Sequence, residues 1–254
     1  MLIPIRDHNP SGRRPYVGWL LIAANVLIFA AYWPLFDEPR ALERFFDAWA
    51  LVPRQVAAGE GWHGLLTSMF LHGGFLHLAG NMLFLWIFGD NLEDALGHLG
   101  FLAFYLGSGV VAGLAQYLAD PASPVPMVGA SGAIAGLMGG YLLLFPRARI
   151  DMLFFLVIFV RVFSLPAWVM LGLWFAFQVL GGAVTSMDGG GVAYWAHAGG
   201  FLAGLVLMLP VFLRLGGPAF WARTHGVPPH PEAVAPSRYT RVPRVPRRRG
   251  PWSS

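Results

Sequence analysis

The stretch that decides the fold class is VGASGAIAGLMGGYLLLF, residues 128–145. It carries no charged side chain, and Pro146 and Arg147 follow directly after it. An apolar run of about 20 residues is long enough to cross the hydrocarbon core of a bilayer as a helix. Within the run, Gly136 and Gly139 leave room for a neighbouring helix backbone to approach closely. We therefore expect a membrane-spanning helix that packs tightly against another helix.

The composition of the whole chain is typical of a membrane protein. Of its 254 residues, 56% are hydrophobic and 12% are charged, whereas about 25% of residues in a soluble domain are charged. Cysteine is absent, which excludes disulfides, thiolate metal sites and a cysteine nucleophile. The seventeen basic residues are all arginine and concentrate towards the two chain ends. This distribution suits membrane topology and anionic lipid better than nucleic acid.

Five further stretches are apolar and long enough to span a membrane. With residues 128–145 they predict an all-α bundle of six transmembrane helices, whose other spans are residues 17–36, 74–93, 100–118, 165–184 and 192–213. The second span has an alternative start at Leu65, but the Gly73-Gly74 pair favours the later start, because paired glycines break a helix. The apolar run 152–163 contains Arg161 and is too short to cross, so we expect it at the membrane interface.

The predicted organisation has three parts: a cytoplasmic N-terminal segment at residues 1–16, a six-span membrane domain at 17–215 and a tail at 216–254. The tail is rich in Pro and Arg, cannot bury a core and is expected to be disordered. Arg13, Arg14 and the arginines after the fourth span fall on the same side as the tail, which the positive-inside rule makes cytoplasmic. We expect an integral protein of a bacterial inner membrane with both termini in the cytoplasm.

Few polar side chains lie inside the predicted spans, and each is expensive to place there. The candidates are Asn25, His77, Asn81, Ser131, Gln178 and His197. Asn25 and Gln178 are adequately explained as interhelical hydrogen bonds. Spans two, four and six all run from outside to inside, and each carries its histidine or serine within about five residues of its start. One hydroxyl and two imidazoles are therefore expected at one depth below the outer surface.

This set of side chains fits the chemistry of a serine protease. A serine hydroxyl is a poor nucleophile without a base, and His197 can accept the proton of Ser131 and return it to the leaving amine. His77 and Asn81 lie four residues apart on one helix face and can donate hydrogen bonds to the oxyanion, together with the backbone N–H of Ser131. Because no acidic side chain lies in a span near His197, we expect a Ser–His dyad.

Three motifs in the chain resemble those of the rhomboid family. GASG at residues 129–132 resembles the nucleophile motif, AHAGG at 196–200 resembles the histidine motif, and HGGFLHLAGN at 72–81 resembles the second-span motif. The resemblance extends from about residue 62 to 213, with the motifs in the family's order. It implies a six-span rhomboid-like bundle.

The resemblance also implies roles for individual residues. Ser131 would be the nucleophile, His197 the general base, and His77 and Asn81 the oxyanion donors. It implies cleavage of single-span or multi-span membrane proteins near the outer side of the bilayer, without a metal, a cofactor or nucleic acid. It implies further that the first loop, near Trp62, lies partly in the membrane together with the adjacent His63.

One position departs from the pattern of the family. Many rhomboids carry Tyr or Phe four residues after the serine, packed against the catalytic histidine, and this chain has Ala135 there. The histidine would then be held less firmly unless another ring fills the space. Phe201, one turn after His197, is the candidate that the sequence offers.

Three other functions remain open on the sequence. A transporter or channel could use the same buried polar residues for a proton relay or for substrate binding, and its activity would not need Ser131. An intramembrane metalloprotease is disfavoured, since an H-E-x-x-H pattern is absent and His72, His77 and His197 have no ligand carboxylate nearby. An inactive rhomboid-like binding protein is disfavoured because both Ser131 and His197 are present.

Overall fold

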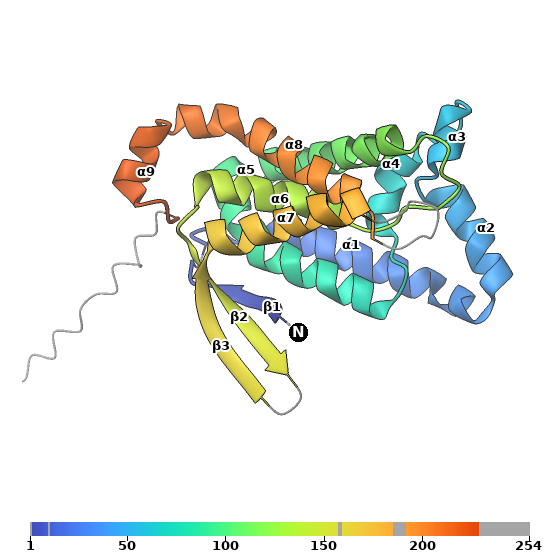
Figure 1. Cartoon of the computed structure of the whole chain (residues 1–254), viewed down its shortest axis with the longest axis horizontal. Helices are drawn as coiled ribbons and strands as arrows, with labels where there is room; N and C mark the ends of the chain where they lie inside the picture. Colours follow the sequence, from blue (N-terminus) through green and yellow to red (C-terminus); the bar gives the residue numbers. More distant parts are fainter. Residues whose placement is uncertain (1, 10, 157–158, 185–191, 229–254) are drawn as a thin grey trace, which may run out of the picture.

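The structure, a computed structural model, describes residues 2–9, 11–156, 159–184 and 192–228. Helices dominate these residues, and a small sheet lies at one end of the bundle (Figure 1). In chain order the elements are β1 (Leu2–Asp7), α1 (Tyr16–Tyr32), a 3₁₀ helix (Trp33–Asp37), α2 (Pro39–Trp49), α3 (Pro53–Ala57), α4 (Gly64–Thr67), a second 3₁₀ helix (Ser68–Phe70), α5 (Phe75–Ala119), α6 (Ser131–Leu144), β2 (Arg149–Leu156), β3 (Phe159–Pro166), α7 (Ala167–Val184), α8 (Tyr194–Arg214) and α9 (Pro218–Thr224).

Four helices in the described part of the chain are long and apolar enough to cross a membrane: α1 with the 3₁₀ turn after it, α5, α7 and α8. α5 is broken at Gly97, where a φ of 70° and a ψ of 167° are not helical, and the chain reverses direction there (Figure 1). α5 begins at Phe75, which agrees with the later of the two predicted starts. α6 has 14 residues, or about 21 Å, less than the hydrocarbon thickness of about 30 Å. The count of six spans therefore stays a prediction.

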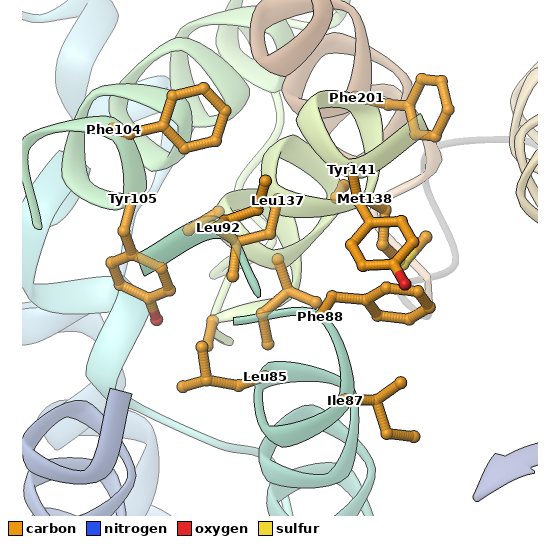
Figure 2. Close-up of a cluster of buried hydrophobic side chains, with 14 of the residues drawn as sticks. Leu85, Ile87, Phe88, Leu92, Phe104, Tyr105, Leu137, Met138, Tyr141 and Phe201 are labelled. Atoms are coloured by element: carbon orange, nitrogen blue, oxygen red, sulfur yellow. The ribbon is translucent and has the colours of Figure 1, made fainter. Parts of the chain in front are cut away.

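α6 forms the centre of the bundle, and its residues 132–141 are all buried. Leu137, Met138 and Tyr141 join a cluster of apolar side chains that includes several from α5 (Figure 2). The ring of Phe88 from α5 meets that of Tyr141 edge-on, with centroids 5.1 Å apart and an interplanar angle of 81°. A helix surrounded by protein in this way can carry no unpaired charge, which explains the composition of the stretch.

Glycine residues allow the backbones of α6 and α8 to lie in direct contact. A Cβ on Gly204 would overlap the carbonyl oxygen of Gly136, and a Cβ on Gly139 would overlap that of Phe201. The prediction that this helix packs tightly through small residues is confirmed. Because both overlaps involve backbone atoms, side-chain rotation cannot relieve them.

Acidic residues in α5 bind the start of α1. Glu93 is buried, and its carboxylate accepts the backbone N–H groups of Val17 at 2.9 Å and Gly18 at 2.8 Å. Asp94 accepts the N–H of Gly12 at 2.7 Å. The first N–H groups of a helix have no intrahelical acceptor and favour a negative charge. The acids therefore have a structural role at the end of the bundle where arginines predominate.

The sheet contradicts the expected all-α architecture. It is antiparallel with the strand order β1-β2-β3, and β2 and β3 form a hairpin from the apolar run expected at the interface. The run is rich in Val, Ile and Phe, which favour strands over helices. The third strand, β1, comes from the N-terminal segment and pairs with β2, which follows α6 in the sequence.

Polar contacts tie β1 to the hairpin. The carboxylate of Asp151 accepts the Ser164 hydroxyl at 2.5 Å and the Arg6 Nε at 2.7 Å, and it lies 2.6 Å from His8 Nε2. The Ser164 hydroxyl, followed by His8 and Arg6, holds the pKa of Asp151 well below its usual range, against the opposing effect of burial. This acid therefore stays ionised and keeps the N-terminal strand in place.

The outer part of the hairpin is apolar on both faces. Leu156 and Phe159 form one cross-strand pair and Phe155 and Val160 the next, so the two pairs lie on opposite faces. All four side chains are about half exposed. Large exposed apolar surfaces mark contact with lipid or with another protein. The location of this hairpin at the membrane interface stays a prediction.

The interface location can be tested because the chain has no cysteine. A Val160→Cys variant labelled with an NBD fluorophore is expected to lose emission in vesicles of brominated lipid, because the hairpin would lie against the acyl chains. Leu27→Cys, on an exposed position of α1, serves as the control for a lipid-facing site. Quenching at position 27 without quenching at position 160 would show that the hairpin does not contact the acyl chains.

The predicted tail begins with structure rather than disorder. α9 buries Phe220, and the indole N–H of Trp221 donates to the carbonyl of Leu143 at 2.9 Å. These two rings give the segment enough apolar surface to dock on the bundle, so the membrane domain extends beyond residue 215. The tail from residue 229 lies outside the described residues.

Candidate active site

A cavity of about 540 Å³ opens where α5, α6 and α8 begin. Its walls include Ser131, His197, His77, Asn81 and Trp174. Among the described residues that line it, none is Asp, Glu, Lys or Arg. All four predicted site residues therefore meet in one space with mostly apolar walls.

Ser131 and His197 face each other across the junction of α6 and α8. Ser131 is the first residue of α6, and His197 lies in the first turn of α8. The Ser131 Oγ and the His197 Nε2 are 2.7 Å apart, a hydrogen-bond distance. The close glycine packing of the two helices makes this contact possible, because it brings their first turns together.

The other ring nitrogen of His197 contacts a residue from α7. His197 Nδ1 lies 2.8 Å from Gln178 Oε1, and the ring of Trp174 lies 5.7 Å from the imidazole at an interplanar angle of 36°. Gln178 was expected to make an interhelical hydrogen bond, and it does. Its partner could not be predicted, because the sequence does not fix the rotation of α7 about its axis.

The sequence offers Phe201 as the ring beside His197. In the structure, the ring of Trp174 lies there instead. Phe201 stacks on Phe175 with centroids 4.7 Å apart. One turn along α8 from His197, Phe201 points towards the apolar core, where it is buried. The aromatic ring that lies near His197 therefore comes from α7.

His77 lies directly beside the nucleophile. The backbone N–H of Gly73 donates to His77 Nδ1 at 3.3 Å, so in the neutral ring Nε2 carries the hydrogen. A Cβ built on Gly129 would lie 2.8 Å from His77 Nε2 and 3.5 Å from Ser131 Oγ. Gly129 also has a φ of 126°, a conformation that favours glycine. The missing side chain and this backbone give the His77 N–H access to the reacting centre.

Asn81 lies one turn after His77 on α5. Its Nδ2 donates to the His77 carbonyl oxygen at 2.9 Å, and a side-chain amide has a second N–H available. Asn81 is buried and lines the cavity. The side chain can therefore donate to a group bound above it while remaining attached to its own helix.

His72 supports His77 from the loop before α5. Its ring lies 5.1 Å from that of His77, and the backbone N–H and carbonyl of His72 both bind the hydroxyl of Tyr32 on α1. In the described part of the chain, no group of three or more His, Cys, Asp or Glu side chains is arranged to hold a metal ion. The His72 backbone therefore connects the loop before α5 to α1.

Comparisons with known proteins agree with the motifs. A family model described as the Rhomboid domain matches residues 59–214. Rhomboid protein 1, mitochondrial, of Saccharomyces cerevisiae is 33% identical over 74% of this chain and 51% of its own length. RHOMBOID-like protein 5 of Arabidopsis thaliana is 34% identical over 55% of each chain. The human presenilin-associated rhomboid-like protein, mitochondrial, is 32% identical over 57% of this chain and 36% of its own length. The chain spans about half the length or less of these relatives.

Proposed function

Because this chain belongs to the rhomboid family and is an integral membrane protein, we propose that it is an intramembrane serine endopeptidase. The observation that carries the proposal is the 2.7 Å contact between Ser131 Oγ and His197 Nε2. It joins a nucleophile and a base from two helices inside a cavity that a peptide segment can enter. A transporter has no need of this pairing.

The first half of the reaction forms an acyl-enzyme. His197 Nε2 takes the proton of the Ser131 hydroxyl as Oγ attacks the carbonyl carbon of the scissile peptide bond. The carbonyl oxygen becomes an oxyanion, which accepts hydrogen bonds from the Nε2–H of His77, the side-chain N–H of Asn81 and the backbone N–H of Ser131. The imidazolium of His197 then protonates the leaving amine, and the C–N bond breaks.

The second half releases the new carboxyl end. A water molecule gives its proton to His197 Nε2 and attacks the ester carbonyl, and the same donors bind the second oxyanion. When this intermediate collapses, the C–O bond to Ser131 breaks and His197 returns the proton to Oγ. No cofactor and no metal ion enters either half of this scheme.

The substrates of the proposed enzyme are single-span or multi-span membrane proteins that arrive through the bilayer. The cavity lies at the beginnings of α5, α6 and α8, which the arginine distribution puts on the outer side of the membrane. Cleavage would therefore occur near the outer end of a substrate span. By the same arginine distribution, both termini would be cytoplasmic, and we expect a bacterial inner membrane as the location.

The direct test is cleavage of a panel of single-span proteins by the purified protein in lipid vesicles. Wild type is expected to release two fragments from at least one member, and the fragments should end near the outer edge of the span. A protein that shows a cooperative unfolding transition but cuts no member of the panel would contradict the proposal. Solute flux that continues in Ser131→Ala would favour a transporter instead.

The oxyanion donors give a separate prediction. His77→Ala is expected to lower kcat by about 10²–10³-fold with less effect on KM, because the lost donor acts mainly in the transition state. Asn81→Ala should have a smaller effect, since one N–H of its side-chain amide already donates to the carbonyl of His77. Steady-state kinetics on a cleaved substrate measure both.

The matched control for this prediction is His98→Ala. It removes the same side chain from the same helix, and His98 contacts Glu93 near the break in α5 and not the cavity. Its kcat should stay within a few-fold of wild type. An unchanged kcat in the His77→Ala/Asn81→Ala double variant would remove both residues from the mechanism.

A further inference from the structure

The side-chain amide of Gln178 is hydrogen-bonded at both ends. Its Oε1 lies 2.8 Å from His197 Nδ1, and its Nε2 donates to the backbone carbonyl of Trp174 at 3.2 Å. The carbonyl of Trp174 can only accept, so the NH₂ group must point towards it. The oxygen is therefore the end of the amide that faces the histidine.

This orientation decides which nitrogen of His197 carries the proton. A carbonyl oxygen has no hydrogen to give, so Nδ1 must be the donor to Gln178 Oε1. A neutral imidazole has one N–H, which leaves Nε2 as the acceptor for the hydroxyl of Ser131. The contact thus selects the tautomer that a general base requires.

The same helix supplies a ring beside the imidazole. Trp174, one turn before Gln178, has its ring centroid 5.7 Å from that of His197 at an interplanar angle of 36°, whereas α6 offers only Ala135 four residues after the serine. Gln178 is buried, while Leu173, Phe177 and Leu180 on other sides of α7 are exposed. α7 is therefore a peripheral helix that contacts the base through two side chains.

We propose that Gln178 is a positioning residue that fixes His197 in the Nδ1–H tautomer, so that Nε2 is free to accept the proton of Ser131. The proposal rests on the function proposed above and extends it. The neutral amide takes the orienting place that a carboxylate has in a Ser–His–Asp triad. It accepts no proton at any step of the proposed reaction.

The test compares two variants of similar size. Gln178→Met keeps the volume but removes the acceptor, and kcat/KM is expected to fall by about 10–100-fold with KM changed little. Gln178→Glu keeps an acceptor and adds a negative charge, so activity at neutral pH should be largely retained. Its acid limb in the pH profile of kcat/KM should move to higher pH, because a carboxylate stabilises the imidazolium. Gln55→Met, the same substitution in α3, is the control.

A second measurement does not depend on turnover. In protein labelled with ¹⁵N-histidine, the His197 signals, assigned by their loss in His197→Ala, should show Nδ1 protonated in wild type and a mixture of tautomers in Gln178→Met. Equal activity losses in the Met and Glu variants with one shared pH profile, or unchanged tautomers in the Met variant, would overturn the inference. Absence of cleavage by wild type with the expected tautomer change would overturn the proposed function alone.

Discussion

Substituting alanine for Ser131 is expected to lower kcat for cleavage by about 10⁴–10⁶-fold, the loss seen when a serine protease loses its nucleophile. His197→Ala should cost about as much, because the hydroxyl has no other base within hydrogen-bond distance among the described residues. The double variant should be no slower than either single variant, since the two side chains act as one unit. Cleavage of one substrate in vesicles measures all three.

The control for these variants is Ser11→Ala. Its hydroxyl donates to the carbonyl of Arg13 before α1, away from the cavity, and its kcat should match that of wild type. Thermal unfolding should show that every variant retains the fold. Substantial cleavage by both Ser131→Ala and His197→Ala would exclude the dyad, whatever the other variants do.

The second large effect concerns the packing of α6 against α8. Gly204→Ala is expected to lower the free energy of unfolding by about 3 kcal/mol or more, because the new Cβ overlaps the backbone carbonyl of Gly136 and the helices must move apart. Separation would also lengthen the contact between Ser131 and His197, so activity should fall with stability. Unfolding in detergent by SDS or heat measures the change.

Gly172→Ala is the matched control for helix packing. A Cβ on Gly172 would meet no atom within 4 Å, so no overlap arises on α7. Alanine has a higher helix propensity than glycine by about 1 kcal/mol, so this variant should be as stable as wild type or slightly more so. Similar destabilisation of both variants would show that the backbone approach of α6 and α8 is not the cause.

Much of the membrane domain could be predicted from sequence because its signals are local. The paired glycines at Gly73 and Gly74 mark the start of α5, and Pro146 marks the end of α6. Counting residues from the start of each span predicts that Ser131, His197 and His77 lie at the same depth. In the structure all three line one cavity. Their catalytic roles remain proposals until variants are measured.

The sheet could not be predicted because its evidence is not local. The Val, Ile and Phe residues in the run that forms β2 and β3 favour a strand, but periodicity does not distinguish a strand from a buried helix in a short apolar stretch. Its pairing with Leu2–Asp7 joins segments that are separated in the sequence by the helices α1 to α6. Only the contacts of Asp151 with Arg6 and His8 show why the N-terminal segment docks there.

The surroundings of His197 required knowledge of helix rotation. Phe201 is the sequence's candidate for the ring beside His197, because it lies one turn after the histidine on the same helix. Its ring packs against Phe175 instead. Trp174 and Gln178 lie on a different helix, and their distance in sequence from His197 gives no sign of contact. Side chains that orient a catalytic group from a neighbouring helix are in general invisible to motif analysis for this reason.

The most direct test of the central claim is to identify the serine that a fluorophosphonate modifies. Purified wild type in lipid vesicles should give one adduct, located by peptide mass spectrometry at Ser131. Ser131→Ala should give none, and His197→Ala should react at least about 10³-fold more slowly, because the hydroxyl has lost its base. Modification of a different serine, or equal rates in wild type and His197→Ala, would contradict the account.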